Sequence, residues 1–151
     1  MAYIAKRDRG AENAPLVFTF HGTGGDESQF HGLARQILPD ANVVSPRGDV
    51  NEMGAARFFR RTGEGVYDMN DLAARTSRMA GFMSEEADAQ SATRVLSLGY
   101  SNGANIAASV SFIAPDTAGD LVLLHPLIPF DPPAQPNLAG KRVLITAGRQ
   151  D

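Results

Sequence analysis

Short apolar runs alternate with stretches of helical periodicity along this chain. In the helical stretches side chains that can face a core recur every three or four positions, as at Leu72, Thr76, Met79 and Met83. The apolar runs are short, and the first of them is rich in β-branched and aromatic residues, which favours strands. We expect strands at residues 16–20, 41–45, 94–98, 120–125 and 141–147, and helices at 28–38, 68–86 and 105–113.

The alternation of strands with helices decides the fold class. Strands that are apolar throughout must be covered on both faces, which is typical of a parallel sheet. We therefore predict an α/β fold with a mainly parallel sheet and helices on both faces. Residues 15–151 are assigned to this domain, and the polar residues 1–14 are expected to form a loosely attached N-terminal segment.

Residues 49–67 have no clean period and contain several glycines, so we expect a long functional loop there. Two adjacent aromatic residues in it, Phe58 and Phe59, either line a substrate pocket or pack the core. The neighbouring arginines are expected to be salt-bridged or solvated rather than substrate clamps: Arg57, Arg60 and Arg61.

Composition and charge exclude several classes of protein. The net charge of −3 gives no broad basic surface, so no nucleic-acid partner is expected. The chain has no cysteine, which rules out disulfides, a thiol nucleophile and thiolate metal sites. No apolar run approaches the ~20 residues of a membrane span, and the charged N-terminus lacks the apolar core of a signal peptide. We expect a cytoplasmic protein.

The strongest chemical signal is the segment 99–103, Gly-Tyr-Ser-Asn-Gly, which follows an apolar run and precedes a helix. It fits the G-x-S-x-G pattern of a nucleophile elbow, in which a tight strand-to-helix turn presents a serine hydroxyl. The two glycines stand where the chain passes close to its neighbours and leaves little room for a Cβ. Ser101 is therefore the candidate nucleophile, against the alternative that the glycines only allow close packing.

Other polar residues also follow the predicted strands directly. His21, Ser101, His125 and Asp151 all fall just past a strand's carboxyl end, the edge at which parallel sheets bind ligands. His21 opens the loop 21–27, whose glycines leave backbone N–H groups free to point inward. We expect His21 to hold this loop, His31 to lie on the surface, and His125 to be a pocket-wall residue.

These motifs together resemble the α/β-hydrolase superfamily, and most closely its phospholipase/carboxylesterase family, which includes acyl-protein-thioesterase-like and MhqD-like carboxylesterases. The resemblance runs from Leu16 onward. It rests on the glycine loop, the arginine–phenylalanine segment with the Glu-Gly-Val-Tyr-Asp that follows it, the elbow and the terminal Gly-Arg-Gln-Asp, which are residues 21–27, 57–61, 64–68, 99–103 and 148–151.

The resemblance implies a role for each matching residue. Ser101 would attack an ester carbonyl and form an acyl-enzyme that water later releases. The backbone N–H groups of Thr23 and Asn102 would form the oxyanion hole. Asp151 would be the acid that orients the catalytic histidine. Lysophospholipids, short acyl esters and acyl thioesters all fit as small-molecule substrates, no cofactor or metal is implied, and a homodimer is left open.

The chain departs from the family at the general base. The fold's order is Ser, Asp, His, but the three histidines here all precede Asp151. We therefore expect the N-terminal portion of a longer hydrolase, with the C-terminal helix and strand missing, and expect the 151-residue form to be inactive or nearly so. The last strand would then form an open apolar edge.

Two rival functions remain at this stage. The missing histidine favours a non-catalytic hydrolase-like binding module. A phosphate-binding glycine loop is weaker, because Gly22 to Gly25 lacks both the Lys-Ser/Thr of a P-loop and the G-x-G-x-x-G spacing.

Overall fold

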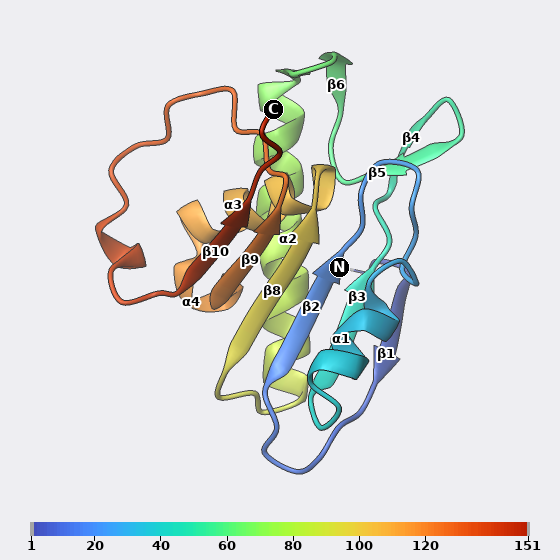
Figure 1. Cartoon of the computed structure of the whole chain (residues 1–151), viewed down its shortest axis with the longest axis vertical. Helices are drawn as coiled ribbons and strands as arrows, with labels where there is room; N and C mark the ends of the chain where they lie inside the picture. The colour runs from blue at the N-terminus through green and yellow to red at the C-terminus, as the bar shows by residue number, and fades with distance from the viewer. Residues whose placement is uncertain (1, 151) are drawn as a thin grey trace.

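A six-stranded sheet runs through the whole molecule in the computed structural model, which describes residues 2–150 (Figure 1). Its strand order is β1-β3-β2-β8-β9-β10, and only β1 is antiparallel to its neighbour. The predicted mainly parallel sheet is thus confirmed. The strands are β1 (Ala5–Asp8), β2 (Leu16–Phe20), β3 (Asn42–Pro46), β8 (Val95–Tyr100), β9 (Asp120–Leu124) and β10 (Val143–Thr146).

Helices cover both faces of this sheet, as predicted (Figure 1). The short helix α1 (His31–Ile37) lies on one face, where Ala34 packs with Val17 and Val43. The opposite face carries the larger core, built from β2, β8 and β9 and from three helices. Those helices are α2 (Met69–Ala89), α3 (Asn102–Ile113) and α4 (Pro115–Ala118).

The helix α2 shows why the apolar periodicity of the sequence predicts a helix. Its predicted stripe of four residues is buried, and Phe82 joins it. Asp68 caps the helix, because its carboxylate accepts a hydrogen bond of 3.0 Å from the amide of Asp71. No helix among residues 2–150 is long and apolar enough to cross a membrane.

The N-terminal residues correct one expectation. Residues 1–14 were expected to be loosely attached, but β1 pairs with β3 from Ala5 to Asp8. Tyr3 is 6% exposed and belongs to the main core, where its ring meets Phe82 edge-on at 5.2 Å. Burial of this one ring and four strand pairings fix a segment whose composition alone is polar.

Residues 49–67 are also more ordered than expected. They form two small hairpins, β4–β5 (Val50–Glu52 with Ala55–Arg57) and β6–β7 (Arg61–Gly63 with Val66–Tyr67). Strands of two or three residues are too short to show an alternating pattern, which explains the wrong prediction. Both hairpins lie at the carboxyl ends of the parallel strands (Figure 1). They therefore border the edge at which a site was expected.

His31 is a second correction. We expected a surface residue, but its side chain is 1% exposed. Its ring nitrogens lie 2.7 Å from Ser45 Oγ and 2.7 Å from Asp8 Oδ2. The ring therefore joins α1 to β3 and β1, and both nitrogens are occupied.

Candidate active site

The turn between β8 and α3 holds Ser101 in a strained conformation. Its φ is 53° and its ψ is −116°, a region that residues with a Cβ rarely occupy. A Cβ on Gly99 would lie 2.5 Å from the Gly103 oxygen, and a Cβ on Gly103 would lie 2.2 Å from the Phe20 oxygen. Both glycines are therefore required by close backbone approach, as the elbow pattern predicts.

The helix after Ser101 presents unpaired amides to this turn. The first hydrogen bond of α3 runs from the Asn105 amide to the Ser101 oxygen, at 3.0 Å. The amides of residues 102–104 precede it and so have no acceptor within the helix. The positive end of the helix dipole adds to their preference for negative charge. Asn102 N–H, next to the serine, is thus available to an anion.

The glycine loop after β2 contributes one more amide. The Gly22 amide donates to Gln29 Oε1 at 2.9 Å, the Gly24 amide to the Ala56 oxygen at 3.0 Å, and the Gly25 amide to the Gly22 oxygen at 3.0 Å. Among the described residues the Thr23 amide has no acceptor. The loop therefore engages three of its four successive amides and leaves that of Thr23 available.

His21 holds this loop, as expected from its position. Its Nδ1 donates to the Gly22 oxygen at 2.7 Å, and its Nε2 accepts from the Gly48 amide at 2.9 Å. These two bonds fix the neutral tautomer with the proton on Nδ1. Burial lowers the pKa of His21, although the Gly22 bond partly opposes that effect. With both nitrogens bonded, His21 is a structural residue.

This fold recurs in proteins of known structure. No protein-family model matches the chain. It is 43% identical over 138 residues to MhqD of Bacillus subtilis (strain 168), a protein named as a hydrolase, and the match covers 90% of this chain and 69% of MhqD. The chain belongs to the MhqD family of α/β-hydrolases.

Two solved structures extend the comparison for this MhqD-family chain. A carboxylesterase of Bacillus cereus is 41% identical with a TM-score of 0.90, over 97% of this chain and 71% of that one. The protein Atu2452 of Agrobacterium tumefaciens, described as of unknown function, is 52% identical with a TM-score of 0.89, over 97% and 72%. The chain is thus a hydrolase of the carboxylesterase type that spans about 70% of these relatives' lengths.

The other predicted site residues of this hydrolase lie in different surroundings. His125 is exposed, has a φ of 53°, and its ring lies 6.2 Å from that of Tyr100. It follows β9, whose Leu124 oxygen accepts from the Ser101 amide at 2.9 Å, so it stands beside the elbow. Asp151 lies outside the described residues.

Phe58 and Phe59 are buried at 1% and 0% exposure in the main core. Both rings therefore take part in core packing, and a role for them in lining a substrate pocket stays a prediction. Phe58 packs against the rings of Phe20 and His21, and its amide donates to Asn102 Oδ1 at 2.8 Å. The side chain of Asn102 thus ties this segment to the elbow, which the sequence pattern gave no reason to expect.

A second unexpected connection joins α3 to the loop after β9. The side-chain amide of Asn105 donates to the Tyr67 hydroxyl at 2.7 Å, and the Tyr67 hydroxyl donates to the Leu127 oxygen at 2.5 Å. The Leu127 amide in turn donates to Asn105 Oδ1 at 2.8 Å. Asn105 is one helical turn after Ser101, so this triangle fixes the wall beside the nucleophile. Burial raises the pKa of the Tyr67 hydroxyl.

The segment that follows β3 has a local structural role. In the tripeptide 47–49, Arg-Gly-Asp, Arg47 forms a two-bond pair with Glu27, and the carboxylate of Asp49 pairs with Arg75 and Arg78. The pair with Glu27 anchors the glycine loop from outside. The charged groups of this tripeptide are thus engaged within the chain.

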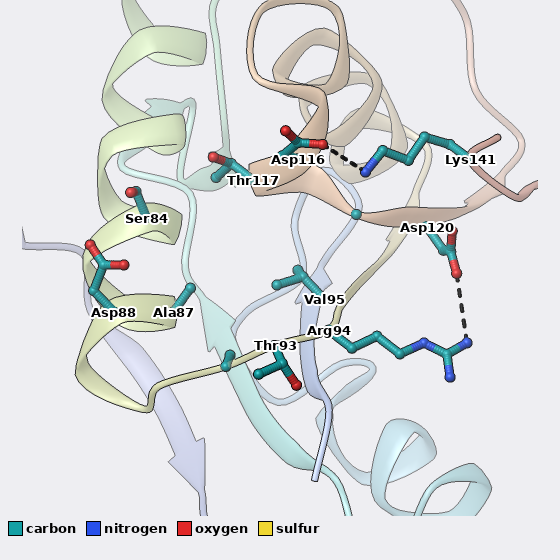
Figure 2. Close-up of a pocket in the computed structure, with 12 residues that line it drawn as sticks. Ser84, Ala87, Asp88, Thr93, Arg94, Val95, Asp116, Thr117, Asp120 and Lys141 are labelled. Atoms are coloured by element: carbon teal, nitrogen blue, oxygen red, sulfur yellow. Dashed lines mark hydrogen bonds and ion pairs between the residues drawn. The ribbon is translucent and has the colours of Figure 1, made fainter. Parts of the chain in front are cut away.

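A hollow of about 470 Å³ lies at the opposite edge of the sheet, where β8, β9 and β10 begin (Figure 2). Four of its charged residues form two pairs with one another. Lys141 bonds Asp116 at 3.0 Å, and Arg94 lies 3.7 Å from Asp120. Because this hollow is distant from the carboxyl ends of the strands, we assign it no part in catalysis.

Proposed function

We propose that this chain provides the nucleophile and oxyanion hole of a serine esterase for small carboxylic esters or thioesters. Ser101 Oγ forms a bond to the carbonyl carbon while its proton passes to a base. The carbonyl oxygen becomes an oxyanion held by the amides of Thr23 and Asn102. The bond to the leaving alcohol or thiol then breaks, and water later releases the acid from the acyl-enzyme.

The conformation of Ser101 carries this proposal. A φ of 53° with a ψ of −116° is costly for a serine, by about 1–3 kcal/mol, and such strain collects at functional sites. Two amides without acceptors among the described residues, Thr23 and Asn102, flank the same turn. A packing role for Gly99 and Gly103 accounts for neither the strain nor the open amides.

The general base is the weak part of this machinery. Of the three histidines, His21 and His31 are buried with both ring nitrogens engaged. His125 is exposed beside the elbow. We propose that the 151-residue chain reacts slowly, since two of its three histidines hold both ring nitrogens in bonds within the fold.

A fluorophosphonate probe tests the nucleophile. Such a probe phosphonylates an activated serine as fluoride leaves and the serine proton passes to a base or to water, and intact-protein mass spectrometry measures the adduct. We expect labelling of the chain that is lost in Ser101→Ala and kept in Ser84→Ala, a serine exposed on α2. Equal labelling of the parent chain and Ser101→Ala would refute the assignment.

The same probe tests the base. The chain should react far more slowly than the Bacillus cereus carboxylesterase under the same conditions. If the two rates match and His125→Gln abolishes the reaction of this chain, His125 is the base and the proposed slow form is wrong.

A non-catalytic hydrolase-like binding module is the second candidate, and the engagement of both ring nitrogens of His21 and of His31 in bonds within the fold favours it. It predicts no covalent adduct at Ser101 at any probe concentration. Saturable binding of a hydrolysis product, such as a short fatty acid, measured by calorimetry would then support the module.

A further inference from the structure

Arg57 is a buried guanidinium for which no carboxylate lies within ion-pair distance among residues 2–150. The residue is 3% exposed. Its Nε donates to the Phe59 oxygen at 3.1 Å, and its guanidinium carbon lies 5.5 Å from the centre of the Phe59 ring. The nearby carboxylate of Glu52 is instead bonded to Arg61, at 2.9 and 3.0 Å. Arg57 thus keeps its positive charge inside the protein without an ion-pair partner among the described residues.

Burying such a charge destabilises the fold, because the guanidinium loses its hydration. The Phe59 oxygen and ring replace that hydration only in part. Burial is also the main cause that lowers the pKa of Arg57, and the charge of Arg61 adds to it. A neutral residue of similar length would fill this space at lower cost. The position therefore calls for a role that needs the cation.

The remaining contact of Arg57 is with the glycine loop, residues 21–27. Its Nη1 donates to Thr23 Oγ1 at 2.7 Å. The residue before it, Ala56, accepts from the Gly24 amide at 3.0 Å. Two successive residues of β5 thus bond two successive residues of the glycine loop. Ala56 does so through its backbone oxygen, and Arg57 does so through its side chain. The residue held by the guanidinium, Thr23, is the one whose amide is left without an acceptor.

We propose that Arg57 is a positioning residue of the oxyanion hole: through the hydroxyl of Thr23 it fixes the direction of the Thr23 amide, and its charge favours the oxyanion. This inference rests on the proposed function, in which Ser101 is the nucleophile. It also explains the role of the β4–β5 hairpin. This hairpin supplies the Ala56 oxygen and the Arg57 guanidinium, which bond the glycine loop.

The reaction of Ser101 with a fluorophosphonate gives the kinetic test, since the phosphoryl oxygen gains negative charge in the oxyanion hole. We expect Arg57→Met to lower the limiting rate by about tenfold with little change in the probe's apparent dissociation constant, less than the 10²–10³ lost with a direct donor. Thr23→Val removes only the hydroxyl and should have a similar effect. The double variant should then be little slower than either single variant, because both remove one contact.

Two further variants separate positioning from general damage. Arg57→Lys keeps the charge without the fork and should recover part of the rate. Arg60→Met removes an exposed guanidinium three residues on and should leave the rate unchanged. Unchanged kinetics in Arg57→Met, or equal losses in Arg57→Met and Arg60→Met, would overturn the proposal. A loss confined to anionic probes would instead make Arg57 a substrate-binding residue and also overturn it.

A measurement without chemistry keeps the two proposals distinguishable. The NMR order parameter of the Thr23 amide should fall from about 0.85 to below about 0.6 in Arg57→Met, while amides of α3 keep theirs. If Ser101 of the parent chain proves unreactive, the proposed nucleophile fails, but this measurement still decides the contact. An unchanged order parameter in Arg57→Met would refute the positioning role.

Discussion

The centre of the sheet and its β10 edge are built in opposite ways. At the centre, the start of α3 approaches β8 at Gly99 and β2 at Gly103. These backbone contacts are so close that an added Cβ has no room at either glycine. At the edge, the side chains of β10 are half exposed, 47% for Val143 and 58% for both Leu144 and Ile145. Among residues 2–150 this strand pairs with β9 and with no other strand.

The difference separates two uses of apolar sequence. The central strands are buried on both faces and hold the strained serine, so each atom there is constrained by its neighbours. The apolar residues of β10 predict a strand equally well, yet little covers them. The expected open apolar edge is thus confirmed for residues 143–146. Substitutions at the centre should therefore act on folding and chemistry, and those at the edge on association.

The largest effect is expected from Gly103→Ala. The new Cβ would lie 2.2 Å from the Phe20 oxygen and 2.4 Å from the His21 oxygen, so backbone rather than a flexible side chain would have to move. We expect a loss of about 3 kcal/mol in unfolding free energy, the upper range for overpacking, measured by urea denaturation.

Gly81→Ala is the matched control for that variant. Gly81 lies on the exposed side of α2, where an added Cβ would meet nothing within 4 Å. Alanine should stabilise the helix by about 0.5–1 kcal/mol. If both alanines changed stability in the same direction and by similar amounts, the close approach at the elbow would not be the constraint that we describe.

The same contrast explains what the sequence could predict. The strand β2 begins and ends where expected, because five successive buried residues leave no alternative to a central strand. The elbow was readable because the G-x-S-x-G spacing is a local pattern, even though Gly103 approaches Phe20, which is distant in the sequence. The helix α1 was harder to predict, since two of its apolar residues, Leu33 and Ile37, are 40% and 63% exposed.

The missed features all depend on partners distant in the sequence. The ring nitrogens of His31 bond Asp8 and Ser45, and neither partner is marked by a local pattern. Arg57 read as one arginine among several, since its contact with Thr23 spans 34 positions. The apolar periodicity and the composition of the sequence predict strands and helices, but they do not predict contacts between residues that are distant in the sequence.

The second prediction concerns the strain at the nucleophile. Ser101→Gly removes the Cβ that disfavours a φ of 53°. Strain of 1–3 kcal/mol is offset in part by the greater freedom of glycine in the unfolded chain, which leaves a net gain of about 1 kcal/mol over Ser101→Ala. Urea denaturation of the two variants gives the difference. A Ser101→Gly variant less stable than Ser101→Ala would mean that the turn is not strained.

The third prediction concerns the sheet edge opposite β10, where the Asp8 carboxylate of β1 bonds His31 and Arg35 of α1. The hydrogen bond with His31, and then the charge of Arg35, hold the pKa of Asp8 below its usual value. A lowered folded-state pKa gives stability that is present above the unfolded pKa of about 3.9 and lost as the pH falls through the folded value. Asp8→Asn should therefore be less stable than the parent at pH 6, with a difference that shrinks below about pH 4.

The measurement is the urea midpoint at pH 6, 4 and 3, with Asp40→Asn, an exposed carboxylate near the same edge, as the control. A difference between Asp8→Asn and the parent that stayed constant over this range would show that the carboxylate charge does not anchor β1.

The smallest change in stability is expected at β10. Ile145→Lys places a charge on a half-exposed edge position and should alter unfolding free energy by no more than about 0.5 kcal/mol. It should nevertheless reduce self-association, measured by light scattering at high protein concentration, because a charged edge strand resists pairing with another chain. The reverse change at the other edge, Lys6→Ile on β1, should increase scattering. If neither variant changed scattering, the bare apolar edge would have no consequence in solution, and the contrast between centre and edge would be one of packing alone.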